Sequence, residues 1–411
     1  MEERPRNLRS MLAEAKDLSE LMVDLAYAAL YFDDHDMASE VSSLEDQMSR
    51  LVQDMRAICV LAVRNPGDAD GMSSVLQVIS AIERIANDAV DIARIVTHRV
   101  GIPAELRPDL ADAEEVSHRV LVEEGSHMAN CPVATLELPV ATGMRIMAVR
   151  RDQDWDTDVN GQTILVPGDV LFLRGSPAGI IRLRELAAAP TWTPPRPPAE
   201  SWLTDLDRAV DLLVEMKDIS EVAVGLAYSA LVLADRGLAA EVRHLESRLD
   251  EMNDELALWV LRAAANAKDP SLLRGLLQLA NAAEDIGDQA NQMVWLIDHG
   301  EEVHPILGIA LGDSDEVVVQ LPVGPGAGVM GASLGELELN IEPGYTVLAI
   351  RRGDRYIYRP TGQAVLLAND EVIASGPDEG REALARRLGW HLERDEETGE
   401  VALVPLANAS A

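Results

Sequence analysis

Leucine, methionine and alanine side chains recur at alternating steps of three and four residues over long stretches of this chain. The first three stretches cover residues 8–32, 37–62 and 72–96, and polar turns at 33–36 and 65–67 separate them. This spacing places apolar side chains on one face of a helix. We therefore predict three long helices that pack side by side as an antiparallel bundle.

The pattern changes after the third stretch. Short apolar runs now alternate with turn residues such as Thr142-Gly143 and Asn160-Gly161. Runs of this kind between turn signals are typical of strands and short helices. We predict strands at 116–122, 144–149, 163–166 and 170–173, and helices at 132–138 and 179–187. Together these elements would form a small mixed α+β module.

A constant offset of 201 residues matches the second half of the chain to the first. The sequence KDLSE at 16–20 lies over KDISE at 217–221, and His98 lies over His299. A proline-rich stretch at 190–198 separates the copies and favours an extended, semi-rigid linker. The second copy is expected to repeat the helices at 212–233, 238–263 and 273–297, and the shorter elements at 317–321, 333–337, 345–350, 364–367, 371–374 and 379–388. Duplication at this length predicts one structural unit that occurs twice.

The charge of the chain limits its partners. The 411 residues include 70 Asp and Glu against 35 Lys and Arg, a formal net charge of −35, and only three of the basic residues are lysine. This balance is typical of a high-salt cytoplasm, where screening makes self-repulsion tolerable, although mildly acidic signalling proteins are similar. Because no basic stripe is present to neutralise phosphates, we predict no nucleic-acid partner.

The sequence also indicates where the protein resides. The two cysteines, Cys59 and Cys131, cannot form a disulfide framework or a cysteine-rich metal site. The charged start MEERPRNLRS does not read as a signal peptide, and the longest apolar run, 222–234, is too short to span a bilayer. We expect a soluble cytoplasmic protein without direct membrane insertion, peripheral at the membrane only through a partner.

The helical parts resemble PhoU, a phosphate-signalling regulator built from two three-helix bundles. The resemblance rests on ERIANDA at 83–89 and EDIGDQA at 284–290, which are similar to the family's Glu-Arg-Ile-Gly-Asp-His-Ala motif. PhoU holds metal clusters on such helices, so the resemblance implies a divalent or iron-type metal. It places this metal on Glu284 and Asp288, and on Glu83 in the first copy. There Asn87 replaces the aspartate, so Asp88 and Asp91 would substitute in part.

A simpler interpretation of these carboxylates competes with metal binding. A Glu and an Asp four residues apart share one helix face and offer hard oxygen ligands. In a chain this acidic, the same spacing also arises in a solvated face or in helix pairing with arginine. Both interpretations stay open from the sequence.

The α+β parts resemble the TrkA-C module, the C-terminal lobe of RCK domains from potassium-channel and transporter regulators. The residues that carry this resemblance are EGS at 124–126, IMAVRR at 146–151 and PGD at 167–169, with LGEL at 334–337 and LAIRR at 348–352 in the second copy. The predicted fold is therefore an α+β multidomain chain of alternating PhoU-like bundles and TrkA-C modules. The expected domains are a bundle at 1–105, a module at 110–188, a linker at 189–200, a bundle at 201–302, a module at 303–390 and a tail at 391–411.

Two arginine pairs are candidates for binding an anionic ligand. Arg150-Arg151 and Arg351-Arg352 each end a predicted strand, and guanidinium groups clamp anions through bidentate hydrogen bonds. Some TrkA-C lobes bind cyclic di-AMP at a dimer cleft, so the resemblance implies a small anionic ligand, cyclic di-AMP or another nucleotide. Two copies could build the cleft internally as a pseudo-dimer, or the chain could form a homodimer. The alternative is that the arginines balance neighbouring carboxylates such as Asp152.

The stretch GAGVMG at 326–331 fits a dinucleotide fingerprint, which makes Gly328 and Gly331 ligand candidates. The helix that follows is too short for a Rossmann crossover, and the first copy keeps few of these glycines. A flexible loop at the mouth of the module is the alternative. We therefore weigh the fingerprint lightly.

The sequence contains no arrangement that indicates catalysis. Its histidines are scattered, and it has no HExxH motif, P-loop or nucleophile elbow. We expect a non-enzymatic protein that regulates cation transport, in particular the transport of potassium ions. In this respect the chain resembles archaeal accessory proteins of ion transport. Its partner would be a membrane channel or transporter subunit. The alternative is a PhoU-like metal-binding regulator of phosphate uptake.

Overall fold

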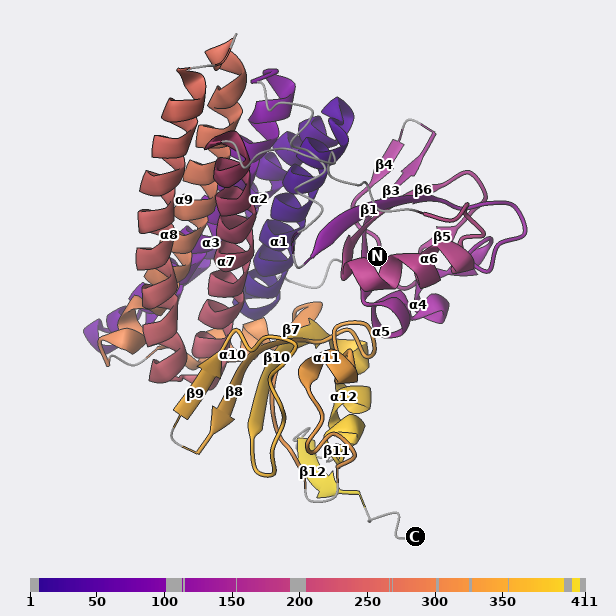
Figure 1. Ribbon diagram of the computed structural model, residues 1–411. Coiled ribbons are helices and arrows are strands. Elements are labelled where there is room, and N and C mark those ends of the chain that lie inside the picture. The colour runs from indigo at the N-terminus through magenta and orange to yellow at the C-terminus, as the bar shows by residue number, and fades with distance from the viewer. Residues whose placement is uncertain are drawn as a thin grey trace.

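Figure 1 shows the chain as a computed structural model. The structure describes residues 7–100, 113, 115–152, 154–192, 205–265, 267, 269–300, 303–324, 327–353, 355–394 and 401–406. Within these residues no helix combines the length and the apolar character needed to cross a bilayer.

The six predicted long helices are present, and they stand side by side (Figure 1). They are α1 (Leu8–Phe32), α2 (His35–Ala62) and α3 (Pro66–Thr97) in the first bundle, and α7 (Asp205–Leu233), α8 (Arg236–Ala264) and α9 (Arg274–Asp298) in the second. Side chains cap them locally: Asp34 accepts hydrogen bonds at the start of α2, and Asn65 forms a capping box with Asp68 at the start of α3.

The two bundles form one packed body. Helix α3 of the first packs along α9 of the second, and one continuous hydrophobic core runs through all six helices. Small residues allow the helices to approach closely. A Cβ atom on Gly287 of α9 would come within 2.3 Å of a methyl group of Leu249 on α8. The two bundles therefore share a single packed core.

The first α+β module (116–186) is a four-stranded antiparallel sheet with short helices. The sheet order is β1 (Val116–Leu121), β6 (Val170–Gly175), β3 (Met144–Arg151) and β4 (Asp154–Asp156), and β2 (Cys131–Pro132) pairs separately with β5 (Ile164–Leu165). The helices are α4 (Val133–Leu136), α5 (Leu138–Thr142) and α6 (Ile180–Leu186). The helix predicted at 132–138 is wrong in one respect: Glu137 has φ of 44°, which breaks it in two. The polar strand β4 lacked an apolar run and was not predicted.

The second module repeats this sheet. Its order is β7 (Glu316–Pro322), β10 (Glu371–Pro377), β8 (Thr346–Arg352) and β9 (Arg355–Tyr358), with α11 (Leu334–Leu337) and α12 (Arg381–Arg387). The strand predicted at 364–367 is reduced to a single bridge between Ser333 and Val365. Four further elements were not predicted: strand β9, helix α10 (Pro305–Leu311), and strands β11 (Trp390–Arg394) and β12 (Val401–Pro405), which pair antiparallel, mostly within the segment expected to be a tail.

The two modules touch each other through equivalent residues. An added Cβ on Gly143 would lie 2.1 Å from the Asn340 carbonyl oxygen, and one on Gly344 would lie 2.3 Å from the Pro139 carbonyl oxygen. Pro139 and Asn340 are themselves 201 residues apart, so the contact has a pseudo-two-fold relation. The amide of Asn340 also donates to Ser176 Oγ at 3.2 Å. Both glycines have positive φ, at 65° and 85°.

The contact between modules can be tested with Gly143→Ala. Its cost should combine the strain of a left-handed backbone with a clash against Asn340, together about 2–4 kcal/mol of unfolding free energy. The matched control is Gly125→Ala, because Gly125 has φ of 81° but nothing within 4 Å of an added Cβ. The control should cost only about 1 kcal/mol. Equal losses for the two variants in urea unfolding would contradict the tight contact.

Candidate metal and ligand sites

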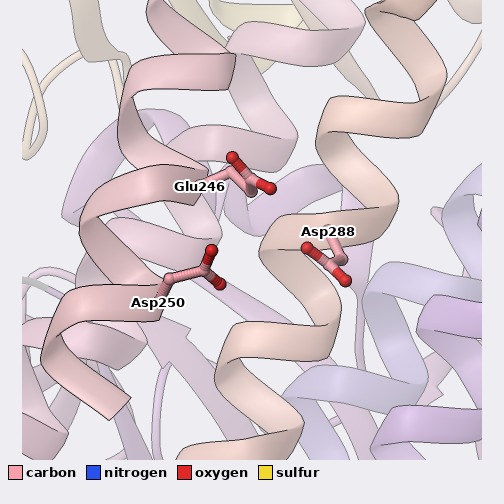
Figure 2. A group of neighbouring side chains, drawn as sticks. All are labelled: Glu246, Asp250 and Asp288. Atoms are coloured by element: carbon pink, nitrogen blue, oxygen red, sulfur yellow. The ribbon is translucent and has the colours of Figure 1, made fainter. Parts of the chain in front are cut away.

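Three carboxylates from two helices meet on the surface of the second bundle. Glu246 and Asp250 lie one turn apart on α8, and Asp288 faces them from α9 (Figure 2). One oxygen from each lies within 4.8 Å of the others. Among the described residues this is the one group of three or more His, Cys, Asp or Glu side chains with such spacing.

Glu284 adds a fourth carboxylate beside this group. Burial, a hydrogen bond with Asp250 and the charge of Asp288 raise the pKa of Glu284 to about 7. Burial and the neighbouring carboxylates Glu246 and Asp250 also raise the pKa of Asp288. The nearby arginines of α8 are paired elsewhere, Arg243 with Asp298 and Arg248 with Glu215. The four acidic groups thus repel one another, and protons or a cation would relieve the repulsion. We call Glu246, Asp250, Glu284 and Asp288 the α8–α9 carboxylate group.

The first copy has lost this arrangement. Ser49 and Asn87 occupy the positions of Asp250 and Asp288, so only Glu45 and Glu83 remain. Glu83 is neutralised by Arg56 at 2.6 Å, and the position equivalent to Arg56 in the second copy is Ala257. At this position the first copy therefore has an arginine that pairs with its glutamate, and the second copy has an alanine.

The other predicted metal ligands of the first copy are not brought together. Asp91 pairs with Arg94 at 2.5 Å. Asp88 faces α9, and burial together with Asp285 and Asp91 raises its pKa to about 8. Glu83 pairs with Arg56, as described. The structure thus groups Glu284 and Asp288 with other carboxylates, but it does not bring Glu83, Asp88 and Asp91 together into one set of ligands.

Sequence reasoning missed Glu246 and Asp250. Their spacing of four residues was a usable signal, because it places both on one face of α8. What the sequence did not indicate was that this face lies opposite Asp288. The donor set consists of carboxylate oxygens, which suit Mg²⁺, Mn²⁺ or iron better than soft metals. On donor chemistry and excess negative charge, the α8–α9 carboxylate group fits the metal that the resemblance implies.

Arg151 and Arg352, two of the predicted anion ligands, are bound inside their own modules. Arg352 holds both oxygens of Asp370 at 2.8 Å and donates to the Val365 carbonyl at 2.9 Å. Arg151 holds Asp169 in the same way, again at 2.8 Å. Both aspartates are fully buried. These bidentate pairs fasten the loop before β6 or β10 to the end of its neighbouring strand in the sheet, β3 or β8.

The other arginine of each pair is also engaged. Arg150 lies 3.6 Å from Asp34 and faces the rings of Trp155 and Phe172. Arg351 pairs with Glu371. An anionic ligand at any of the four arginines would have to compete with these contacts, so anion binding there stays a prediction.

The glycines of the suspected fingerprint differ in their backbone role. Gly331 has φ of 84°, and its N–H donates to the Leu366 carbonyl at 2.8 Å. Asn130, its counterpart, has φ of 59° and makes the same bond to Leu165 at 2.7 Å. The two copies thus keep one turn geometry despite the change of residue. The positive φ of this turn explains why a glycine occurs at position 331. Gly328 has open space around its Cα, and Gly326 lies outside the described residues.

Family models match nearly all of both copies. The PhoU domain model matches residues 12–96 and 213–296, and the TrkA-C domain model matches residues 118–188 and 318–389. The two family resemblances and the tandem order are therefore confirmed. No curated protein matches the chain at a significant level. None of these matches tests the predicted archaeal and halophilic origin, which stays a prediction.

Solved structures give more distant similarities. PhoU from Pseudomonas aeruginosa is 18% identical over 71% of this chain and 93% of that chain, with a TM-score of 0.38. The GsuK RCK domain is 15% identical over 76% of this chain and 78% of its own, with a TM-score of 0.17. The GsuK channel bound to NAD is 14% identical with a TM-score of 0.19, and the match spans 65% of the channel chain.

The role of Arg352 can be tested with Arg352→Met. Burial alone would raise the pKa of Asp370, but hydrogen bonds from Arg352 and the Leu367 N–H lower it below its usual value. Removing the arginine leaves a buried carboxylate without its partner, so we expect a loss of about 2 kcal/mol in unfolding free energy near pH 7. A depressed pKa stabilises the fold above the unfolded value, and this stabilisation is lost as the pH falls. The difference from wild type should therefore shrink below about pH 4.

The control for this variant is Arg386→Met, which removes an exposed pair with Glu382 at 2.8 Å. That change should cost less than about 1 kcal/mol. If Arg352→Met were as mild as the control across the pH range, Arg352 would be free for another task such as ligand binding.

Proposed function

Because this chain contains two PhoU domains and two TrkA-C domains, we propose that it is an accessory protein that regulates potassium transport. Both families are regulatory and non-catalytic, which agrees with the absence of catalytic motifs in the sequence. The coarser role, a regulatory one linked to ion transport, follows from the domain families themselves. The choice of potassium, and of a membrane channel or transporter subunit as the partner, is the proposal.

The observation that carries the proposal is how the modules are fastened to the bundles. Lys16 of α1 donates to the Glu316 carbonyl of the second module at 3.1 Å. Its counterpart Lys217 of α7 donates to the Glu115 carbonyl of the first module at 3.4 Å. Each bundle therefore contacts the module of the other copy. A change in the relative pose of the two modules would pull on α1 and α7 together.

This cross-connection supports a transmitting role. Residues of both sheets, among them Phe172 and Leu348, belong to the same core as the bundle helices. Packed cores pass displacement on because they have little free volume. Ligand binding between the modules would thus reach the outer helices, where a transporter subunit could dock. The predicted alternative, control of phosphate uptake, is less well supported because it does not account for the two TrkA-C modules.

Transport measurements would test the function. We expect deletion of the gene in its host to change the rate of potassium uptake and to leave phosphate uptake unchanged. The tagged chain should also co-purify a cation channel or transporter subunit from detergent-solubilised membranes. A changed phosphate uptake with normal potassium uptake would overturn the proposal in favour of the alternative.

We also propose that the α8–α9 carboxylate group binds a divalent or iron-type metal. Asp288→Asn should lower the affinity for Mn²⁺ or Fe²⁺ by about tenfold or more, because it removes one of few charged ligands. The matched control is Glu45→Gln, which alters the position equivalent to Glu246 in the first copy. Calorimetry and metal analysis measure both. Equal affinity in the Asp288 variant and the wild type would remove the metal site.

A further inference from the structure

A cavity lies where the two modules meet the first helices of the two bundles. Its volume is about 120 Å³. Its wall draws on α1, α7, β3, β6, β7, β8 and β10, and it includes both members of several repeat-related pairs, such as Glu20 with Glu221 and Glu115 with Glu316. The cavity therefore straddles the pseudo-two-fold axis of the molecule. It is separate from the α8–α9 carboxylate group and from the arginine pairs.

The two halves of this junction are not equal. The half beside Tyr228 holds most of the cavity, whereas the equivalent place beside Tyr27 is a space of only about 30 Å³. Two substitutions between the copies account for the difference. Asp24 and Arg174 on the first side are replaced by Gly225 and Ser375 on the second, whereas Arg145 lines the larger space. Large charged side chains thus fill one half, and small ones leave the other half open.

In the filled half, an arginine bridges two carboxylates. Arg174 lies 2.7 Å from Glu115 and 3.1 Å from Glu221, and it also pairs with Asp24. Asp24 is buried to 98% of its surface, since its relative exposure is 2%. The guanidinium group of Arg174 therefore occupies this half of the junction.

In the open half, the equivalent carboxylates lack that bridge. Glu20 pairs only with Lys16, at 2.8 Å, which matches the Lys217–Glu221 pair of the other half. Glu316 accepts a hydrogen bond from Ser375 at 2.9 Å and has Arg145 at 3.8 Å. Ser375 stands where the other half has Arg174. No guanidinium therefore bridges Glu20 and Glu316 as Arg174 bridges Glu221 and Glu115, and Arg145 reaches only Glu316, at 3.8 Å.

The local charge also favours a cation. Among the described residues at this junction, Lys16, Arg145, Arg174 and Lys217 face Glu20, Asp24, Glu115, Asp218, Glu221 and Glu316. The four cations are already paired: Arg174 with three carboxylates, Lys16 and Lys217 with the glutamate one turn on, and Arg145 with Asp24 and Glu316. Two negative charges remain in excess, and they lie around a partly buried space where solvent screens them weakly.

We propose that this cavity binds a small organic cation, an alkylguanidinium or alkylammonium ion, with its charged head between Glu20 and Glu316. Val318 and Leu348 line the same space and would contact an aliphatic stem. A head group with several N–H donors suits two carboxylates better than a bare metal ion does. The site would give the proposed regulator a ligand, but it does not depend on that function, because binding is measurable on the purified chain alone.

Glu20 and its counterpart Glu221 differ in their ionisation. Burial raises the pKa of Glu20, and Lys16 offsets this only in part. In the filled half, burial also acts on Glu221, but Arg174 and Lys217 lower its pKa below the usual value. The two glutamates thus differ because Arg174 contacts Glu221 directly, whereas the guanidinium of Arg145 acts on Glu20 more weakly. Burial would raise the pKa of Glu316, but Arg145, Lys16 and Arg174 lower it below its usual value, so this carboxylate stays charged.

Binding can be tested by calorimetry and thermal unfolding of the full chain. Butylguanidinium and butylammonium chloride are the probes, butylurea is the neutral control, and sodium chloride keeps the ionic strength constant. We expect saturable heat and a rise in unfolding temperature with the two cations and neither effect with butylurea. Absence of saturable binding by both cations would overturn the proposal. So would saturable stabilisation by potassium chloride alone, which would make the site inorganic, or by butylurea.

Two variants locate the site. Gly225→Asp with Ser375→Arg installs the occupant of the other half, and the backbone has room because a Cβ on Gly225 would meet only Leu348 methyl groups at 3.4 and 3.5 Å. This variant should abolish binding of butylguanidinium and unfold at a higher temperature than wild type. The control Ser247→Arg adds an arginine on the exposed face of α8 and should bind normally.

Glu20→Gln removes one charge while keeping the side chain's size, and it should weaken binding by about tenfold or more. This single variant still tests the binding site if the double variant does not fold. Unchanged affinity in Glu20→Gln, or in a folded double variant, would show that the probe binds elsewhere and would overturn the proposal.

Discussion

A lysine ammonium taken out of water must be surrounded by carboxylates or carbonyl oxygens, and two such lysines fix the architecture of this chain. Lys16 and Lys217 are only 2% and 8% exposed. Each satisfies one bond within its helix, to Glu20 or Glu221, and a second at the first strand of the module from the other copy. Neither requirement can be met by one copy alone. The tandem chain therefore folds as an interlocked pair, and the order of its four modules in space follows from where these two charges find partners.

On this shared frame the two copies diverge in a consistent direction. At the bundle surface the first copy supplies Arg56 beside Glu83, where the second has Ala257 beside a richer set of carboxylates. At the central junction the first copy supplies Arg174, where the second has Ser375. In both places the first copy supplies an arginine that the second copy lacks. The asymmetry in ion pairing thus recurs at two separate places in the molecule.

Features that depend on residues close together in the chain could be predicted from the sequence, and features that depend on contacts between distant residues could not. Long helices and the α+β modules were predictable because their apolar periodicity is local and strong. The constant offset of 201 residues also showed each pattern twice. Strand β4 and helix α10 were missed because a three-residue polar strand and a seven-residue helix carry too little pattern. Arg151 and Arg352 were correctly placed at strand ends, but no local pattern indicated that the buried Asp169 and Asp370 would engage them. The pairing of α8 with α9 that joins Glu246 to Asp288 depends on packing, and no spacing along the chain reports it.

Covalent duplication explains why such asymmetry can exist. In a symmetric homodimer, a substitution that fills one half of a central cavity fills both, because the two halves are the same gene product. Here Asp24 and Arg174 can close one half while Gly225 and Ser375 keep the other open. A single occupant then acts on an interface whose opposite side is held rigid by the Arg174 ion pairs, so its effect cannot be shared equally between the bundles. A charge held between Glu20 and Glu316 meets α1 directly, so α1 is the helix through which its effect enters the shared core of the two bundles.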